Sequence, residues 1–580
     1  MLRNRHSKGQ SLSASSAAAE PLLSGSIADS DVLSDSVSDS PDTDAALTTT
    51  MTAPLPTEIN LVTLNCWGLK VLSKQRNERL ATIGCRLAAA SPSPDIVCLQ
   101  ECWCQDDYEA IRRETRFVLP YGKFYFSGAF GGGLAILSRW PIEESSMHAY
   151  PLNGRPTAFW RGDWYVGKGI AWAMIRYGPN RRDVVEVFNT HTHAPYESGP
   201  KDSYICHRLA QSWEMSKLLR SACDRGHLVL AMGDFNMIPL SFPHRLITAN
   251  APVRDVWRVL HPDSAIGPYD NPSERARRRP VPTAMFNVLE NGATSDSVFN
   301  SWRWTPEQQK QHAKGKRVEI PPDTLDRRGK RLDYIFASTG LTPDSPLGTP
   351  GWVVKDARVG MLEPHETLGC SLSDHFSVEA TLALHIPSAA SVSARSKPGT
   401  SSSAADSGTL NPPSSASSGS ASAVASTAPV ISKAQEDFFD SQLFGSAVPD
   451  AETSLLTAGT YDDILDLVHF YMRRQEDQRY WQAWIFYASV VVLVGCLVAV
   501  WWSPYAWVSF LLLFVSSMFL VVGVINGLIC LLFGGSEKRA LMEFEWEIMN
   551  AKAGGDMALH SGGSRSQLMT ATANEREKMV

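Results

Sequence analysis

The sequence is poor in cysteine, and the cysteines that it has follow no regular spacing. Ten are scattered over 580 residues, and the polar N-terminus carries no apolar run of the kind found in secretory signals. We therefore expect a reducing compartment and no disulfide framework. Cys98, Cys102 and Cys104 are close enough together to raise zinc as an alternative. No Cys or His pair at zinc-finger spacing accompanies them, which favours ordinary thiols.

An excess of positive charge is also lacking. The chain has 54 basic and 60 acidic residues, a net charge of −6, so it has no bulk basic field that would attract a nucleic-acid backbone. This disfavours a nuclease, and no nucleic-acid partner is expected. The local basic run at residues 275–279 is interpreted as a solvated loop, with contact to anionic lipid headgroups as the alternative.

Two segments lack the apolar and aromatic residues that a packed core requires. Residues 1–56 are rich in Ser, Ala, Asp and Thr, and residues 387–434 are rich in Ser, Ala, Pro and Gly. Neither can bury enough apolar surface to offset the entropy of ordering, so both are predicted to be disordered. Residues 57–386, between them, contain no internal repeat and are long enough for one large domain.

The C-terminal part is strongly apolar. Residues 484–502 and 505–533 contain no charged residue, and each run is long enough to cross a hydrocarbon core of about 30 Å as a helix. Only Ser503 and Pro504 separate the two runs, which predicts an antiparallel transmembrane hairpin. The alternative is a pair of buried helices in a soluble protein, and charge-free runs of this length disfavour it.

The charges that flank the hairpin predict its orientation. The basic residues on its outer sides are Arg473, Arg474, Arg479, Lys538 and Arg539. By the positive-inside tendency, both termini and the large domain should be cytosolic, with residues 534–580 as a cytosolic tail. Residues 435–480 carry apolar positions at helical spacing and predict a juxtamembrane helix, packed on the domain or lying among headgroups. The endoplasmic reticulum, the outer mitochondrial membrane and the plasma membrane all remain open.

Short apolar runs in the 57–386 segment end at polar residues. The runs that predict buried strands are 59–64, 95–100, 184–189, 228–232 and 331–336. The polar residues at or just past these ends are Asn65, Glu101, His191, Asp234 and Asn236, and Asp333 lies within the last run. Buried strands that end in this way present side chains at one rim, where an active site would be built.

These residue types suit hydrolysis of a phosphodiester. Glu101 and the amide oxygen of Asn65 are hard donors appropriate to Mg²⁺, which would polarise a phosphoryl oxygen. His375 is a candidate general base, and Asp333 is a candidate to hold its tautomer. The candidates for binding the transition state or assisting the leaving oxygen are His191, Asp234 and Asn236. Each is unremarkable alone, and only their joint occurrence favours a function.

Seven motifs in order resemble a known superfamily. They are LNCWGL at 64–69, LQECW at 99–103, GLAILSRWPI at 133–142, NTHTHA at 189–194, GDFN at 233–236, DYIF at 333–336 and SDHFSV at 373–378. As an ordered set they resemble the DNase I-like endonuclease/exonuclease/phosphatase superfamily. LNCWGL, the THTHA form and the two C-terminal spans resemble, more narrowly, neutral sphingomyelinases and the yeast-type inositol phosphosphingolipid phospholipase C.

The resemblance implies a four-layer αββα sandwich followed by the two-helix hairpin. It also implies Mg²⁺-dependent phospholipase C chemistry, which releases ceramide and a phosphorylated headgroup from sphingomyelin or inositol phosphosphingolipid. Glu101 would be the principal metal ligand, with Asn65 nearby and Asp374 beside the general base His375. The residues that would face or orient the phosphate and support the base are His191, Asp234, Asn236 and Asp333. Asp296 lies in a family-like stretch in which Ser295 replaces the usual Cys, and we assign it no role.

Residues 162–168 have the spacing of a phosphate-binding P-loop. Gly169 lacks the hydroxyl that would bind Mg²⁺, and residues 170–177 alternate like a strand where a P-loop must open a helix. An ATPase or GTPase is therefore rejected. In neutral sphingomyelinases the corresponding stretch holds an Asp and a Lys five residues later, proposed as a switch that responds to anionic lipid. Asp163 and Lys168 reproduce this spacing, and an incidental exposed ion pair is the alternative.

The expected partners are a membrane sphingolipid and, as an option, an activating anionic phospholipid. No protein partner is inferred. Two rival hypotheses stay open: another phosphodiesterase of the superfamily, such as a phosphoinositide phosphatase or nuclease, and an inactive membrane-anchored lipid-binding scaffold. Loss of Glu101 or His375 would have favoured the scaffold, and both residues are present.

Overall fold

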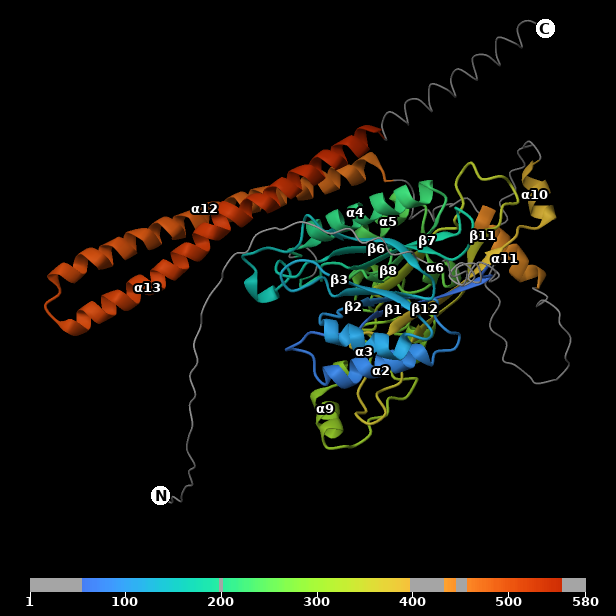
Figure 1. Ribbon diagram of the computed structural model, residues 1–580, viewed down its shortest axis with the longest axis horizontal. Helices are drawn as coiled ribbons and strands as arrows, with labels where there is room; N and C mark the ends of the chain where they lie inside the picture. The colour runs from blue at the N-terminus through green and yellow to red at the C-terminus, as the bar shows by residue number, and fades with distance from the viewer. Residues whose placement is uncertain (1–54, 198–201, 397–431, 445–455, 555–580) are drawn as a thin grey trace, which may run out of the picture. The chain divides into compact units, whose positions relative to one another are not determined.

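The computed structural model describes residues 55–197, 202–396, 432–444 and 456–554 (Figure 1). All the described residues belong to one compact unit of the chain. The predicted disorder of residues 1–56 and 387–434 falls mainly outside the described residues. The described portion of the second segment includes a short helix, α10 (Ala389–Ser396).

Two six-stranded sheets form the centre of the domain. The first holds, in spatial order, β11 (Gly351–Gly360), β12 (Ser377–His385), β1 (Glu58–Asn65), β2 (Ile96–Gln100), β4 (Leu134–Ser138) and β3 (Tyr121–Tyr125). The second holds β5 (Ile142–Ala149), β6 (Gly169–Arg176), β7 (Val184–His191), β8 (Leu228–Asp234), β10 (Asp333–Ala337) and β9 (Arg254–Asp255). The pairs β1–β2 and β7–β8 are parallel and the other pairs are antiparallel. All five strands predicted from apolar runs are present.

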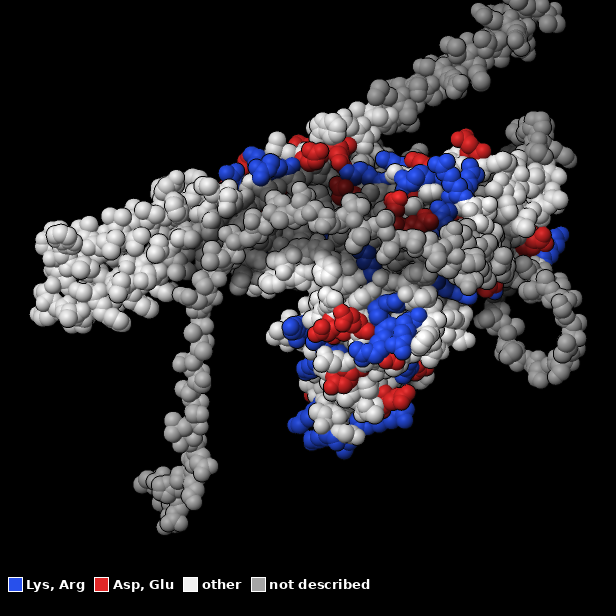
Figure 2. All heavy atoms as spheres, viewed as in Figure 1, with Lys and Arg blue, Asp and Glu red and all other residues white. Residues whose placement is uncertain are grey.

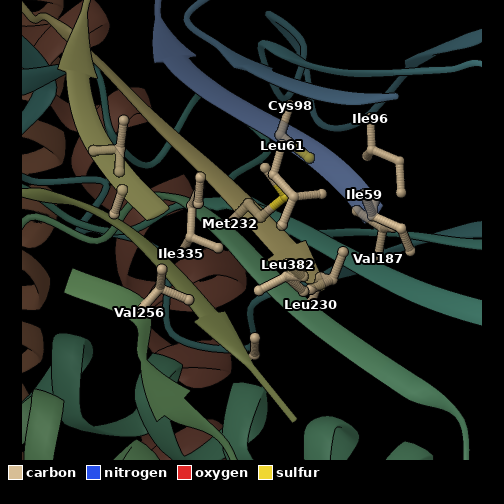
Figure 3. Packing of buried hydrophobic residues seen from close by; sticks show 14 of the residues in the cluster. Ile59, Leu61, Ile96, Cys98, Val187, Leu230, Met232, Val256, Ile335 and Leu382 are labelled. Carbon is tan, nitrogen blue, oxygen red and sulfur yellow. The ribbon is translucent and has the colours of Figure 1, made fainter. Parts of the chain in front are cut away.

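The main core lies between the two sheets. Ile59 and Leu61 of β1 pack in one buried cluster with Val187 of β7 and with Leu230 and Met232 of β8 (Figure 3). Side chains alternate along a strand, so the other face of β1 points away from this core. Each sheet therefore has a second apolar face that needs a cover.

Helices cover both outer faces. The apolar positions of α2 (Arg76–Ala88) fall three and four residues apart and pack, with α3 (Gln105–Thr115), on the first sheet. On the other side, α4 (Ile205–Asp224) and α5 (Phe242–Asn250) pack on the second sheet. Figure 1 shows these two helix pairs on opposite sides of the strands. The layers run helix, sheet, sheet, helix, which confirms the predicted αββα sandwich.

Short helices fill the connections around the sandwich. They are η2 (Phe159–Arg161), α6 (Val256–Leu260), α7 (Pro272–Ala276), α8 (Ala284–Leu289), η4 (Ser301–Arg303) and α9 (Pro306–Ala313). The basic run 275–279 begins at the end of α7. There Arg277 pairs with Glu274, and Arg279 pairs with Asp263, so part of its charge is neutralised.

A long antiparallel hairpin follows the domain. After α11 (Lys433–Phe444) come α12 (Ala458–Ala499), η5 (Val500–Trp502), α13 (Ala506–Leu528) and η6 (Ile529–Phe533), and residues 534–554 continue as helix. Lys538 pairs with Glu476 and Lys552 pairs with Asp462, so the two arms run in opposite directions. Both arms are long and apolar enough to cross a membrane. This confirms the predicted hairpin.

The far part of the hairpin is uncharged and exposed. It carries neither blue nor red side chains in Figure 2, and only 11% of the most apolar stretch of each arm is buried. Such exposure does not fit the alternative of two buried core helices.

The near part of the hairpin packs on the domain instead. Ile464 and Val468 of α12 and Leu541 of the 534–554 helix share a buried cluster with Leu209 and Trp213 of α4. The hairpin is thus joined to the helix layer that covers the second sheet.

Candidate active site

Strand register places three of the predicted site residues side by side. In the second sheet, Asp234 at the end of β8 lies opposite His191 of β7 and opposite Asp333 of β10. In the first sheet, Asn65 ends β1 opposite the last residue of β2, and Glu101 follows that residue. Asn65 Nδ2 donates to Asp234 Oδ2 at 3.0 Å and to Glu101 Oε1 at 3.1 Å. The two sheets therefore contribute to one site.

A glycine and a left-handed residue shape the GDFN turn. Gly233 has a φ of 145°, and a Cβ there would lie 2.0 Å from the carbonyl oxygen of Thr190, so no other residue fits. Asn236 has a φ of 45°, which Asn tolerates better than most residues. Its backbone N–H donates to Asp234 Oδ1 at 3.0 Å, and its side-chain Nδ2 donates to the carbonyl of Thr192 at 3.2 Å.

His375 and Asp333 form a buried pair. His375 Nδ1 donates to Asp333 Oδ2 at 2.8 Å, which leaves Nε2 as the nitrogen available for proton transfer. Burial acts to lower the pKa of His375, but the charges of Asp333 and Asp234 outweigh it and hold the pKa well above its usual value. A divalent cation nearby would lower this pKa again.

The unsatisfied oxygens of the site fit a divalent metal. Glu101 Oε2 and Asp374 Oδ1 are buried and accept no hydrogen bond from any described residue. Burial, and then the charge of Asp374, raise the pKa of Glu101 to about 7. Two half-buried carboxylates that repel each other are stabilised by a nearby cation, and oxygen donors suit Mg²⁺ or Ca²⁺.

A second group of possible ligands lies beside this pair. Ligand atoms of Asp234, Asp333 and His375 lie within 4.8 Å of one another. His375 and Asp333 are hydrogen-bonded to each other, and Asp234 accepts from Asn65 and Asn236. One oxygen of this group, Asp333 Oδ1, is also buried without a partner among the described residues. Because an ion bound here would compete with the His375–Asp333 bond, Glu101 and Asp374 are the better ligand pair.

Asn65 faces the carboxylates with its amide nitrogen and not with the oxygen that was expected to bind a metal. Its Oδ1 accepts from the backbone N–H of Trp67 at 3.0 Å, and its Nδ2 faces the carboxylates of Glu101 and Asp234. To bind a metal through oxygen, the amide would have to turn and break the bond to Trp67. In this arrangement Asn65 positions the two carboxylates.

His191 is buried and neutral. Its Nε2 lies 3.6 Å from Asp234 Oδ2, and its Nδ1 has no hydrogen-bond partner within the described part of the chain. Burial and then the charge of Lys168 hold the pKa of His191 well below its usual value. A neutral imidazole at this place can donate one hydrogen bond to an anionic substrate.

Asp163 and Lys168 do not form an exposed ion pair. Their side chains are nearly buried, with residue exposures of 6% and 5%. Lys168 Nζ donates to the carbonyl of Thr192 at 2.9 Å, and Asp163 Oδ2 accepts from the hydroxyl of Tyr196 at 2.7 Å. Burial lowers the pKa of Lys168, while the charges of Asp163, Glu101 and Asp234 act against that shift. Both residues therefore belong to the surroundings of the site.

The chain is similar in sequence to known proteins. Residues 62–375 match the model of the Endonuclease/Exonuclease/phosphatase family. The chain belongs to this family. It is 35% identical over 496 residues to the inositol phosphosphingolipids phospholipase C of Schizosaccharomyces pombe, covering 85% of this chain and 94% of that protein. The Saccharomyces cerevisiae protein of the same name is 31% identical over 521 residues, covering 85% of this chain and 90% of that protein.

More distant matches were also found. Sphingomyelin phosphodiesterase 2 of Rattus norvegicus is 33% identical over 199 residues, which are 34% of this chain and 46% of that protein. The crystal structure of SmcL is 18% identical, covers 57% of this chain and 99% of that one, and has a TM-score of 0.36. The family and its curated members confirm the resemblance and the prediction of a phosphoric diester hydrolase.

In this member of the family the sequence motifs missed several side chains. Arg303 Nε lies 2.8 Å from Asp296 Oδ1 and Lys330 Nζ lies 2.8 Å from Asp296 Oδ2, while Arg303 also reaches Asp374 at 3.7 Å. No spacing in the sequence signals these contacts. Beneath the site, Gln100 donates to Asn189 at 2.7 Å. The presence of one polar residue within each of two apolar runs is the signal from which this hydrogen bond could have been predicted.

The zinc alternative has no support in the structure. All ten cysteines are free, and Cys98 and Cys102 are buried among apolar side chains. Burial raises the pKa of both thiols, which disfavours the thiolates that zinc requires.

Proposed function

We propose that this protein is a membrane-anchored phospholipase C that hydrolyses sphingolipid phosphodiesters to ceramide and a phosphorylated headgroup. The observation that carries the proposal is the His375–Asp333 pair beside Glu101 and Asp374, each of which has one buried oxygen without a hydrogen-bond partner among the described residues. The relatives that match 85% of the chain are named for inositol phosphosphingolipids, and those named for sphingomyelin match about a third of it. Inositol phosphosphingolipid is therefore the first substrate to test.

In the proposed reaction, His375 Nε2 takes a proton from a water molecule as its oxygen attacks phosphorus. The new P–O bond forms as the bond to the ceramide oxygen breaks on the opposite side, and that oxygen takes up a proton from solvent to give ceramide. Asp333 holds the Nδ1–H tautomer of His375 and stabilises the imidazolium that results. Base catalysis of this kind contributes roughly 10²–10⁴-fold in rate.

Other residues stabilise the charge that develops. His191 and Asn236 flank Asp234 and offer hydrogen bonds to the phosphoryl and departing oxygens. Glu101, which Asn65 positions, and Asp374 would hold Mg²⁺. When bound, this ion would neutralise negative charge on the phosphoryl group.

We further infer that the hairpin spans a membrane with both termini and the catalytic domain on the cytosolic side. Arg479 and Lys538 lie where the apolar parts of the two arms meet the domain, which is the arrangement that the positive-inside tendency predicts. An anionic phospholipid is the proposed activator, acting near Lys168.

The test uses full-length protein in detergent, with inositol phosphosphingolipid and sphingomyelin labelled in the ceramide part. We expect labelled ceramide with Mg²⁺ and none after chelation. His375→Ala should lower turnover by about 10²-fold or more. His148→Ala, which changes an exposed histidine of β5, is the matched control and should behave as wild type. Hydrolysis of a phosphoinositide or DNA in place of both sphingolipids would show that the rival phosphodiesterase hypothesis is right.

A further inference from the structure

We propose that residues 126–133 and 159–167, here called the aromatic loop pair, form a surface of the catalytic domain that inserts into the same bilayer as the hairpin. This surface does not include the proposed catalytic residues, and the proposal does not depend on which lipid is hydrolysed. It would hold the mouth of the site at the depth of the headgroups.

Backbone hydrogen bonds join the two loops into one unit. The N–H of Phe130 donates to the carbonyl of Tyr165 at 3.2 Å, and the N–H of Gly167 donates to the carbonyl of Gly131 at 3.0 Å. A β-bridge between Gly128 and Val166 lies alongside these bonds. The loops approach so closely that a Cβ on Gly128 would lie 2.5 Å from the backbone of Gly167.

The outer side of this unit is apolar and aromatic. Phe126, Phe130 and Trp160 are 70%, 66% and 79% exposed. Residues 126–133 contain no charged side chain, and the two charges of the other loop are not free, since Arg161 pairs with Glu197 and Asp163 is buried. Three exposed large aromatic side chains on two joined loops that carry no free charge mark a site of interaction.

A ring contact places this surface at the level of the membrane boundary. The ring of Trp164 packs on the ring of Phe533 at 4.7 Å, and Phe533 is the last residue of η6. The apolar span ends there, because the helix that follows carries Glu537, Lys538 and Arg539. Trp164 also contacts Tyr165 at 5.0 Å, so aromatic rings continue from the hairpin into the loop pair.

Phe130 extends this chain of rings outward, since its ring lies 6.2 Å from that of Tyr165. Aromatic side chains at this depth are favoured in the headgroup region, where one end is apolar and the other is wet. The bilayer is therefore the occupant that fits, because the loop pair continues the apolar surface of the hairpin. The contact with Phe533 at the end of the apolar span gives no comparable argument for a second copy of the chain or another protein as the occupant.

The test measures insertion directly, without enzymatic activity. Phe130→Cys is labelled with an environment-sensitive fluorophore in the full-length protein, placed in phosphatidylcholine nanodiscs that contain or lack lipids with a quencher on the acyl chain. Phe117→Cys is the matched control, since Phe117 is an 84% exposed aromatic residue of a different loop. Leu513→Cys, on the exposed surface of α13, reports whether the hairpin itself is in the bilayer. Labelled wild type gives the background from native thiols.

We expect the lipid quencher to reduce fluorescence at position 130 and at position 513, and to leave position 117 at background. Quenching at 513 with none at 130 would overturn the proposal and leave the membrane anchor intact. Absence of quenching at 513 would refute the anchor and the proposal together. Disulfide-linked dimers through position 130, without lipid quenching, would identify a second copy as the occupant and would also overturn the proposal.

A second variant tests the consequence for catalysis. Phe126→Ser with Phe130→Ser should reduce turnover of bilayer substrate by about tenfold or more, because burial of even one such side chain contributes a factor of about that size. Hydrolysis of a soluble short-chain substrate should stay at the wild-type rate, because neither residue contacts the catalytic group. An equal loss on both substrates would indicate a folding defect and count against the proposal.

Discussion

At the scale of single residues, the charged side chains of the site set one another's protonation states. Asp234 and Asp333 act on one imidazole, and Glu101 and Asp374 act on each other with buried oxygens that lack partners among the described residues. In a buried setting these interactions are strong, so each side chain sets the protonation of its neighbours. Replacing one carboxylate should therefore change the pH dependence of catalysis as well as its rate.

Asp333→Asn tests this coupling. The amide keeps the shape of the carboxylate but removes its charge and can donate to Nδ1, which favours the wrong tautomer of His375. We expect kcat to fall by roughly 10²–10⁴-fold. Because the charge of Asp333 raises the pKa of His375, its loss should move the acidic limb of the kcat/KM profile to lower pH. Profiles at saturating Mg²⁺, with exposed Asp356→Asn as control, check both effects, and an unmoved limb would contradict the coupling.

Sequence motifs predicted which residues lie in the site, and the structure shows how these residues contact one another. Glu101 and His375 belong to ordered motifs, so their presence in one site could be predicted from the sequence. The orientation of the Asn65 amide could not, because it depends on a bond to the backbone of Trp67. Tyr196 and Arg303 were missed because a single Tyr or Arg in a loop is common, and its partner is distant in the chain.

At the scale of elements, strand existence was easier to predict than strand register. The apolar runs ended within two residues of the observed strand ends, since a buried strand stops where polar residues begin. The pairing of Asp333 with Asp234 across β10 and β8 could not be predicted. A shift of one residue would turn Asp333 to the opposite face, and only the whole packed sheet excludes that shift.

The loop before β6 brings a cation to the site. Lys168 is buried, its ammonium donates to Thr192, and the charges of Glu101 and Asp234 act on it. Lys168→Met removes the charge and keeps the length of the side chain. We expect turnover to fall by about tenfold or more, because a positive charge near the developing phosphoryl charge is lost.

The melting temperature of Lys168→Met should not fall, since burying the ammonium carries a desolvation cost that Met avoids. Exposed Lys123→Met of β3 is the control. The measurements are ceramide release on vesicles containing anionic phospholipid and thermal unfolding in detergent. Wild-type turnover on those vesicles would remove Lys168 from the proposed mechanism and from the proposed lipid response.

At the scale of the whole molecule, the hairpin and the sandwich share a buried polar contact. Glu537, just past the second span, is 6% exposed. Its Oε1 lies 3.7 Å from His207 Nε2 of α4 and 3.8 Å from Arg474 Nη2 of α12, and neither carboxylate oxygen has a hydrogen-bond partner among the described residues. Composition showed the two spans but gave no sign that a carboxylate would be enclosed where they meet the domain.

Glu537→Gln should make the stability of the contact between hairpin and domain less sensitive to pH. Burial raises the pKa of Glu537 from 4.5 to about 7, against the opposing charges of Arg474 and Arg155. The folded state therefore binds this proton more tightly, and stability is lost as pH rises from 4.5 through 7. His207 does not compensate, because burial holds its pKa well below the usual value and keeps it neutral.

Gln cannot ionise, so Glu537→Gln should raise the free energy of unfolding above pH 7, by at most about 3 kcal/mol, and change it little near pH 5. Thermal unfolding of the full-length protein in detergent at pH 5 and pH 8 measures the difference. Glu543→Gln alters an exposed carboxylate on the same helix and should leave the pH dependence as in wild type. If Glu537→Gln lowers stability equally at both pH values, the charged carboxylate stabilises the contact between hairpin and domain. In that case the expected cost of burying the ionised carboxylate is absent.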